Sequence, residues 1–313
     1  MRDEPLIFLA GPTAAGKSEV AVELALRIGG EIVSADSMQV YRGMDIGTAK
    51  LPPAERRGVP HHLLDVLEVA EDWDVAKFRK LAQAAMDDIR ARHARPIIVG
   101  GSGLYMRALL RGLFEGPGRD ETARARLETL DTPTLRRQLE QADPAAVARI
   151  HSNDRRRMIR ALECFAITNR PISEMQTQWR ANSEFRIPNS EFQLIGLQRP
   201  RPEIYGRCDR RVDLMMERGL IGEVKNLLQR GLKPDSTAGK AIGYAEAICY
   251  LAGEFSFENM IKKVKQRTRR FAKHQWTWFR HETGIRWLDM AETETTGQIV
   301  DRLETLLGSP PTA

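Results

Sequence analysis

The chain has 313 residues, of which 42% are hydrophobic and 29% charged, and a formal net charge of +6 with a pI near 9.3. This composition indicates a soluble globular protein with one large domain or two smaller ones. No apolar run approaches the length of a membrane span and no signal-peptide pattern is present, so we expect a cytoplasmic protein without a membrane partner. Three widely spaced cysteines exclude a disulfide framework and a CxxC metal site. The basic balance permits a nucleic-acid partner without requiring one.

The most informative segment is residues 11–18, which fits the pattern G-x-x-x-x-G-K-[ST] of phosphate-binding P-loops. An apolar run at Leu6–Ala10 predicts a buried strand before this segment. The spacing of Val20, Leu24 and Ile28 predicts an amphipathic helix after it. Strand, glycine loop and helix N-terminus together form a cradle for a di- or triphosphate group. The loop alone identifies neither the ligand nor the reaction.

Candidate chemical groups lie in the loop and at the next strand end. Lys17 is expected to pair with phosphate oxygens, and the Ser18 hydroxyl to hold Mg²⁺. Asp36 follows a strand predicted at 31–34, and its carboxylate could coordinate magnesium, act as a general base or cap a turn. The buried strand at 96–99 ends in Gly-Gly-Ser-Gly, where ATP-hydrolysing P-loop proteins usually carry an acidic residue. This absence favours a small-molecule kinase or a diphosphate-using transferase.

The predicted elements indicate an α/β fold. Strands alternate with helices, including one predicted at 73–91, which is typical of a parallel sheet. Between residues 116 and 188 strand-like runs disappear and Arg/Glu-rich helical patterns replace them. We therefore expect a P-loop parallel-sheet core formed by residues 1–115 and 189–313, with an inserted helical domain over 116–188. Further along the core we expect one strand and two helices, at 192–197, 204–229 and 257–280.

Basic residues gather in the last predicted helix and in the insertion. A stripe expected to pack recurs in steps of three and four: Ile261, Val264, Thr268, Phe271, Gln275 and Trp278. Two neighbouring faces carry Lys262, Gln266, Arg269, Lys273, Trp276 and Arg280, and Lys263, Arg267, Arg270, His274 and His281. Such faces suit a phosphate backbone, although a solvated basic surface gives the same pattern. The insertion carries Arg155, Arg156, Arg157 and Arg160. One of Arg207, Arg210 and Arg211 could neutralise a leaving diphosphate, or all three could pair with nearby carboxylates.

Six motifs occur in order along the chain: residues 11–18, 36–42 (DSMQVYR), 45–50 (DIGTAK), 100–105 (GGSGLY), 241–244 (AIGY) and 273–280 (KHQWTWFR). On these motifs the chain resembles the bacterial tRNA dimethylallyltransferases (tRNA isopentenyltransferases) over nearly its full length. The resemblance implies a prenyltransferase that moves a dimethylallyl group from dimethylallyl diphosphate to N6 of the adenosine 3′-adjacent to the anticodon of tRNA. It also implies that this ATP-type P-loop holds the isoprenoid diphosphate instead of ATP.

The resemblance also implies roles for individual residues. The diphosphate-binding residues would be Gly11, Pro12, Thr13, Ala14, Ala15, Gly16, Lys17 and Ser18. Four residues would be catalytic: Thr13 and Lys17 contact the diphosphate, Asp36 takes a proton from the attacking amine, and Arg211 steadies the departing diphosphate. Ser18 would lie near Mg²⁺, the expected cofactor. The tRNA-binding residues would be Asp36, Ser37, Met38, Gln39, Ser102, Arg124, Arg156, Arg157, Met158, Ile159, Arg160, Lys273, His274, Gln275, Trp276, Thr277, Trp278, Phe279 and Arg280.

The implied partners are dimethylallyl diphosphate and the tRNA anticodon stem-loop, the latter contacted by the helical insertion, and we expect a monomer. Departures from the family pattern are mild. Ala15 lacks a hydroxyl that is frequent there, Ser18 and Ser102 stand where threonine is usual, and His274 replaces a usual arginine. Three alternatives stay open. They are an adenylate isopentenyltransferase acting on free nucleotides, a small-molecule P-loop kinase and a non-catalytic RNA-binding protein.

Overall fold

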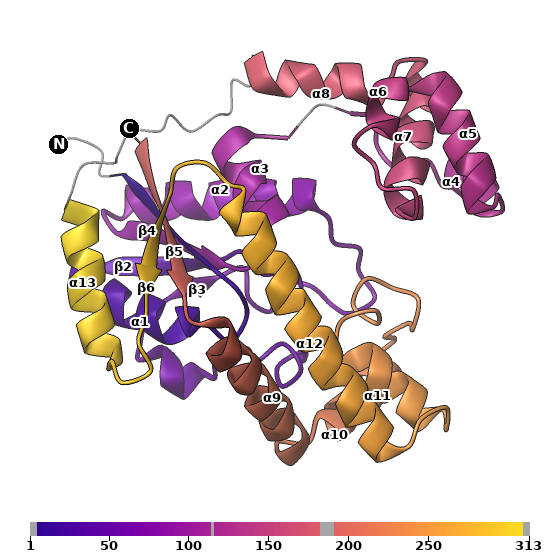
Figure 1. Cartoon of the computed structure of the whole chain (residues 1–313). Coiled ribbons are helices and arrows are strands. Elements are labelled where there is room, and N and C mark those ends of the chain that lie inside the picture. The colour runs from indigo at the N-terminus through magenta and orange to yellow at the C-terminus, as the bar shows by residue number, and fades with distance from the viewer. Residues whose placement is uncertain (1–4, 114–115, 182–190, 309–313) are drawn as a thin grey trace. The chain divides into compact units, whose positions relative to one another are not determined.

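Figure 1 shows the computed structural model of the chain, in which residues 5–113, 116–181 and 191–308 are described. The chain divides into two compact units. The first comprises residues 1–109 and 187–313, and the second comprises residues 110–186. The boundary expected between residues 188 and 189 lies outside the described residues.

The first unit is built on a parallel β-sheet, as predicted from the sequence. Its six described strands have the order β3-β2-β4-β1-β5-β6, and every pair is parallel. The strands are β1 (Leu6–Ala10), β2 (Gly30–Ser34), β3 (His61–His62), β4 (Arg95–Gly100), β5 (Phe192–Gln198) and β6 (Ile285–Asp289). Ala10 pairs with Gly100 on one side and Gly196 on the other, so the P-loop leaves the sheet between two neighbouring strand ends. Ligands of open parallel sheets bind at this carboxyl edge.

Helices cover both faces of the sheet (Figure 1). The helices of this unit are α1 (Lys17–Ile28), α2 (Val75–Ala91), α3 (Gly103–Arg111), α9 (Arg201–Glu217), α10 (Leu220–Gln229), α11 (Tyr244–Leu251), α12 (Phe257–Arg280) and α13 (Thr296–Gly308), with a 3₁₀ turn, η1 (Pro53–Arg56). Strand side chains alternate between faces, so Ile7 and Leu9 pack with α1 and α13 while Phe8 points to the opposite face. There α2 packs on β2 and β4.

The second unit is helical, as the disappearance of strand-like runs predicted. Its helices are α4 (Glu121–Glu128), α5 (Thr132–Ala142), α6 (Pro144–Val147), α7 (Arg155–Thr168) and α8 (Ile172–Ala181). Aspartates cap the N-termini of several of these helices; Asp131, for example, accepts from the backbone N–H of Thr134. Leu135, Leu139 and Met158 are fully buried in the small apolar core of the unit.

The structure corrects several of the expected elements. The helix expected at 204–229 is two helices, because Gly219 takes a left-handed conformation (φ 90°) between α9 and α10. The sequence analysis did not anticipate β3, β6, α11 or α13. β3 has only two residues, and β6 mixes apolar with charged residues, so neither gives a clear apolar run. In the part of the chain that is described, no helix is long and apolar enough to span a membrane.

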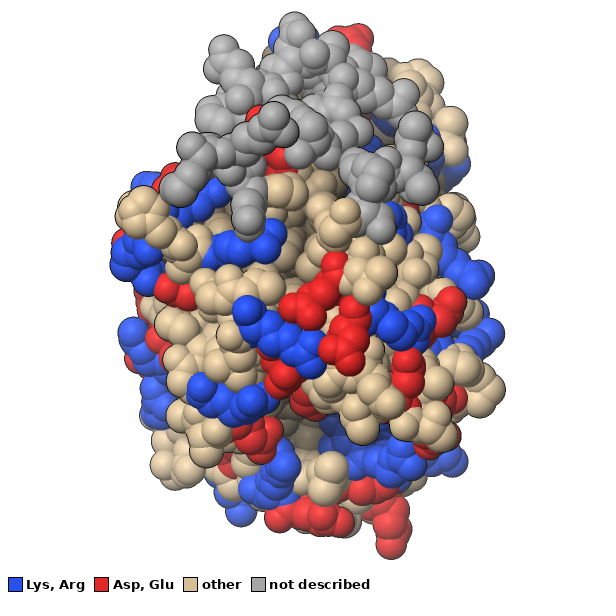
Figure 2. Space-filling model, turned by 90° about the vertical axis from the view of Figure 1, so that its left-hand side faces the viewer, with Lys and Arg blue, Asp and Glu red and all other residues tan. Residues whose placement is uncertain are grey.

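Acidic and basic side chains are interspersed on the face of the molecule seen in Figure 2. Acidic and basic side chains also form ion pairs that join helices of the first unit. Arg27 of α1 pairs with Asp301 and Glu304 of α13, and also with Glu23 of its own helix. Such exposed pairs contribute little stability, about 1 kcal/mol or less each. An anion-binding site needs positive charge that acidic side chains do not neutralise.

Candidate functional site: a P-loop cavity with surplus positive charge

The loop between β1 and α1 has the strand–loop–helix context that a P-loop requires. Gly11 has φ 146°, and a Cβ atom there would lie 2.4 Å from the carbonyl oxygen of Leu197 on the neighbouring strand. Gly16 has φ 98° and directly precedes the first helical residue, Lys17. Both glycines are therefore required by backbone geometry. The loop places the N-terminus of α1 at the carboxyl edge of the sheet.

Cationic side chains donate hydrogen bonds to carbonyl oxygens of this loop. Lys17 Nζ donates to Pro12 O (2.8 Å) and Arg207 Nε donates to Ala14 O (2.7 Å). Arg199 Nε donates to Ala15 O (3.2 Å). The C=O and N–H of one peptide unit point in opposite directions. These bonds therefore turn the N–H groups of the same peptide units away from the arginines. The sequence analysis missed Arg199, whose role in the loop has no local signature.

Thr13 joins the loop to two other elements. Arg211 Nη1 of α9 donates to Thr13 Oγ1 (3.0 Å), while its Nη2 donates to Thr48 O (2.8 Å). The backbone N–H of Thr13 donates to Gln275 Oε1 of α12 (2.8 Å). The structure therefore brings together Thr13, Lys17 and Arg211, three of the four residues predicted to be catalytic.

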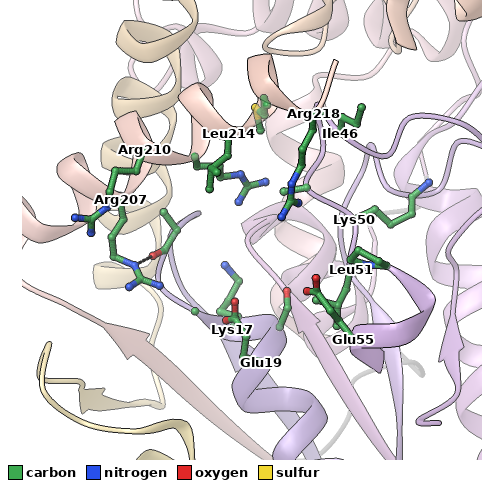
Figure 3. A pocket seen from close by; sticks show the side chains of 17 residues that line it. Lys17, Glu19, Ile46, Lys50, Leu51, Glu55, Arg207, Arg210, Leu214 and Arg218 are labelled. Atoms are coloured by element: carbon green, nitrogen blue, oxygen red, sulfur yellow. Dashed lines mark hydrogen bonds between the residues drawn. The ribbon is translucent and has the colours of Figure 1, made fainter. Parts of the chain in front are cut away.

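A cavity of about 380 Å³ opens between the P-loop, the segment around residues 46–55 and α9 (Figure 3). Side chains of Lys17 and Arg218 enter it from opposite walls (Figure 3). Six cationic and two acidic residues line it: Lys17, Lys50, Arg207, Arg210, Arg211 and Arg218, and Glu19 and Glu55. Lys50 is neutralised by Asp45 and Asp65 (2.6 Å each). The four arginines make no ion pair with any described residue, so the cavity carries a surplus of positive charge that suits a polyanion.

Burial lowers the pKa of two of these groups. Burial, with a smaller contribution from Arg211, lowers the pKa of Lys17 to about 8. Burial likewise lowers the pKa of the Arg211 guanidinium. The negative charges of Asp36 and Glu19 oppose both shifts in part. A bound anion would relieve the same penalty.

Asp36 stands just beyond the end of β2, and part of its carboxylate belongs to a turn. Its Oδ1 accepts from the backbone N–H of Met38 (2.8 Å) and of Gln39 (3.3 Å). The turn-capping interpretation of this residue is therefore correct for Oδ1. Oδ2 accepts no hydrogen bond from the described residues, and the turn fixes its direction. The carboxylate acts electrostatically on both Lys17 and Arg211, so it belongs to the same constellation.

A further set of residues, missed from the sequence, holds the segment that accepts from Arg211. Glu223 of α10 accepts from the backbone N–H groups of Asp45, Ile46 and Gly47 at 2.7–3.2 Å. Tyr244 donates its hydroxyl to the same carboxylate (2.6 Å), and a Cβ on Gly47 would collide with the Tyr244 ring. The only sequence signals for this support were the motifs at 45–50 and 241–244, to which no chemistry had been assigned.

Helix α12 presents a different buried face from the one predicted. The packed residues are Met260, Val264, Thr268, Ala272, Gln275 and Phe279. Phe271 is 46% exposed, so the predicted stripe is rotated by part of a turn. Arg267 and Arg269 are partnered by Glu246 and Asp209. The exposed basic residues are Lys262, Lys263, Arg270, Lys273, His274 and Arg280, and the Arg280 guanidinium stacks on Trp276, 4.1 Å from the ring centroid.

Comparison with known proteins identifies the family. The model of the IPP transferase family matches residues 39–282, which is most of the chain. The chain belongs to the IPP transferase family. It is 45% identical over 308 residues to a tRNA dimethylallyltransferase of Pelotomaculum thermopropionicum, covering 96% of each chain. It is 46% identical over 295 residues to tRNA dimethylallyltransferase 2 of Geotalea uraniireducens, covering 93% of this chain and 94% of that one.

Solved structures agree with this assignment to the IPP transferases. A tRNA isopentenylpyrophosphate transferase of Bacillus halodurans superimposes with a TM-score of 0.72 at 41% identity, covering 97% of this chain and 96% of that one. A eukaryotic dimethylallyltransferase acting on tRNA superimposes with a TM-score of 0.81 at 27% identity, covering 99% of this chain and 81% of that one. The resemblance inferred from the motifs is confirmed.

In this IPP transferase chain the predicted tRNA-binding residues are not equally accessible. Met158 and Ile159 are buried in the core of the second unit, and Gln275 and Phe279 lie on the buried face of α12. Their side chains are covered by protein, and contact of these residues with tRNA stays a prediction. Arg160 donates to Glu163 (2.8 Å), and Arg124 lies 3.9 Å from the same buried carboxylate.

The remaining predicted tRNA residues keep accessible atoms. The exposed side chains are those of Arg156, Arg157, Lys273, His274, Thr277 and Arg280. Partly exposed ones are Asp36, Ser37, Met38, Gln39, Ser102, Trp276 and Trp278. Trp278 lies under the Arg107 guanidinium (4.6 Å to the ring centroid) and against Gly103, where a Cβ would meet its ring at 2.1 Å. The glycines after β4 therefore serve helix packing.

Proposed function

We propose that this chain transfers a dimethylallyl group from dimethylallyl diphosphate to N6 of the adenosine 3′-adjacent to the anticodon of tRNA, releasing diphosphate. The observation that carries the proposal is the constellation at the strand ends. A P-loop cavity with unmatched arginines acts together with a fixed carboxylate, Asp36, in a chain of the IPP transferase family. The curated relatives and solved neighbours are named for the same activity.

The leaving-group half of the reaction belongs to the P-loop. Breaking the allylic C–O bond sends its electron pair to the diphosphate oxygen, where negative charge builds up. Lys17 and Arg211 are held by bonds to neutral oxygens and supply opposing charge, and Thr13 contacts the diphosphate from the loop. The dipole of α1 adds to this stabilisation.

Magnesium fits the same place. Mg²⁺ prefers oxygen ligands and is commonly held by one or two protein groups together with substrate phosphates. The Ser18 hydroxyl lines the cavity beside Lys17, at the N-terminus of α1, and would hold the ion together with diphosphate oxygens. When bound, the ion supplies Lewis-acid neutralisation of the diphosphate.

The nucleophile half of the reaction belongs to Asp36. As the adenosine N6 forms its bond to the allylic carbon, the nitrogen gains positive charge and must lose a proton. Asp36 Oδ2 accepts that proton, while Oδ1 stays bonded to the backbone at Met38 and Gln39. The turn thus orients the base before the substrate arrives.

The exposed basic face of α12 and the pair Arg156 and Arg157 of the helical unit are the proposed contacts with the anticodon stem-loop. The N6 amine of a base stacked in the anticodon loop cannot reach Asp36 at the end of β2, so the target adenosine is flipped out of the loop. The proposed enzyme is monomeric and cytoplasmic.

One assay tests the proposal. The protein is incubated with Mg²⁺, labelled dimethylallyl diphosphate and either unmodified tRNA or AMP, and separately with labelled ATP. Label should enter tRNA alone. Entry into AMP would favour an adenylate isopentenyltransferase, and phosphoryl transfer from ATP would favour a kinase. Binding of tRNA without any transfer would favour a non-catalytic RNA-binding protein.

The Asp36→Ala variant separates the two halves of the reaction. Transfer should be abolished while the tRNA dissociation constant, measured by filter binding, stays nearly unchanged. A large loss of tRNA binding would mean that Asp36 positions RNA and is not the base.

A further inference from the structure

Gln275 is the residue through which α12 reaches the P-loop. It is 8% exposed and lies on the packed face of the helix. Its Oε1 accepts from the backbone N–H of Thr13 (2.8 Å), and its Nε2 donates to Gly101 O (2.9 Å). Among the hydrogen bonds between described residues, no other α12 side chain bonds to the loop. One buried amide therefore joins the carboxyl ends of β1 and β4.

The surroundings of this amide leave no room for another arrangement. A Cβ on Gly101 would lie 2.2 Å from Gln275 Nε2 and 3.2 Å from Gly11 O. The strand end, the loop and the helix are thus in direct contact at this point. Losing the amide would leave the part-buried N–H of Thr13 and the buried C=O of Gly101 without this partner. The cost is about 1–3 kcal/mol for the buried C=O and less for the part-buried N–H.

Thr13 is held from two sides. Gln275 fixes its backbone, and Arg211 fixes its hydroxyl at 3.0 Å. Both bonds fall on Thr13, the second of the four variable residues of the P-loop, which directly precedes Ala14 in the cavity wall. A group that must meet developing charge has to be held within a fraction of an ångström, and a misplacement of about 1 Å can cost about 100-fold in rate.

We propose that Gln275 is a positioning residue for prenyl transfer: it fixes Thr13 against the end of β4 and links the RNA-facing helix α12 to the diphosphate-binding loop. This inference rests on the proposed function. The exposed neighbours Lys273 and His274 stand on the same helical turn, so the helix that meets RNA is anchored directly to the loop.

The test uses Gln275→Met, which keeps length and volume but removes both hydrogen bonds. At saturating substrates kcat should fall about 10- to 100-fold, while the tRNA dissociation constant stays within about twofold of wild type. The matched control is Thr268→Val on the same packed face, whose hydroxyl bonds only to Val264 O of its own helix (2.8 Å). It should leave kcat unchanged. A raised tRNA dissociation constant with unchanged kcat in Gln275→Met would overturn the proposal.

A double-mutant cycle separates positioning from a general effect on stability. If Gln275 acts by placing Thr13, then Gln275→Met should cost much less in a Thr13→Ala background than in the wild type. Equal, additive losses would overturn the proposal. The cycle is read in kcat and also in the dissociation constant for inorganic diphosphate. The second readout stays informative even if wild-type protein failed to modify tRNA, an outcome that would contradict the proposed function alone.

Thermal unfolding checks that each variant is folded. Should Gln275→Met not fold, Gly101→Ala disturbs the same bond from the other side, because its Cβ displaces the Gln275 amide. It should then show the same fall in kcat with unchanged tRNA affinity. Full activity in that variant would contradict the proposal.

Discussion

Arginines gather at two places in this protein and use their charge in opposite ways. In the P-loop cavity, Arg207 and Arg211 donate to neutral oxygens, the carbonyls of Ala14 and Thr48 among them. In the helical unit, Arg160 donates to the fully buried carboxylate of Glu163. An arginine bonded to neutral oxygens keeps its charge available for a ligand, whereas one that meets a carboxylate has that charge neutralised within the fold.

A count of arginines therefore does not locate an anion site. The sequence motif at 156–160 groups a structural arginine with two exposed ones, and only their partners separate them. Substitutions at the two places should therefore have effects of different kinds.

The largest effect is expected at Arg211. Arg211→Gln should lower kcat about 100- to 1,000-fold, because it removes a charge aimed at the leaving diphosphate. Folding should be nearly unaffected. Single-turnover transfer to tRNA measures the first effect and thermal unfolding the second. Near-normal transfer would mean that Arg211 does not act on the leaving diphosphate, and the contrast with Arg160 would no longer hold.

The opposite pattern is expected at Arg160. Arg160→Gln leaves buried Glu163 with one less partner and should weaken the helical unit by about 2 kcal/mol, or about 30-fold in local opening. Hydrogen exchange of α7 in the full-length protein measures the opening. Unchanged exchange, together with a large rise in the tRNA dissociation constant, would assign Arg160 to RNA binding instead.

Smaller effects are expected at the exposed neighbours. Arg156→Ala and Arg157→Ala should each weaken tRNA binding about two- to tenfold and reduce the salt dependence by about one phosphate contact. Exchange of α7 should not change in either variant. Salt-dependent filter binding is the measurement, and an unaltered slope in both variants would exclude a phosphate contact at this place.

The smallest expected effect is the uptake of a fraction of a proton when diphosphate binds. Because the pKa of Lys17 is lowered to about 8, this lysine is half charged at pH 8, and a bound diphosphate should restore its full charge. Binding should therefore take up about half a proton from Lys17 at pH 8, and affinity should fall as the pH rises further. Calorimetry in two buffers of different ionisation enthalpy measures this uptake. Lys17→Arg, which stays charged, provides the baseline for the diphosphate's own ionisation, and equal uptake in both proteins would contradict the lowered pKa.

The core of the fold could be predicted because its signals are local. The P-loop at 11–18 is flanked by an apolar strand and an amphipathic helix, and β1, β4 and β5 each contain a short buried apolar run. By contrast, β3 and β6 are short or mixed in polarity and form only because a neighbouring strand offers its edge. Tertiary pairing decides such elements, so the sequence pattern alone does not reveal them.

The candidate site divides in a similar way. Lys17 and Asp36 stand in motifs whose chemistry is local, and the sequence predicted them directly. Glu223 and Arg199 support the site through backbone atoms of distant segments, and a carboxylate that accepts from three backbone N–H groups has no sequence signature. Gln275 was predicted as an RNA contact from the family resemblance and as part of the packed stripe of α12, and its bonds to Thr13 and Gly101 appear only in the structure.

If the P-loop cavity serves alkyl transfer and not phosphoryl transfer, the product and the leaving group of one reaction will show it. After reaction with labelled dimethylallyl diphosphate, the tRNA is digested, the label is located by mass spectrometry and the released diphosphate is counted. We expect one dimethylallyl group on N6 of the adenosine 3′-adjacent to the anticodon, with one diphosphate released for each group transferred. Release of orthophosphate with a phosphorylated product, or label on amines elsewhere in the tRNA, would contradict it.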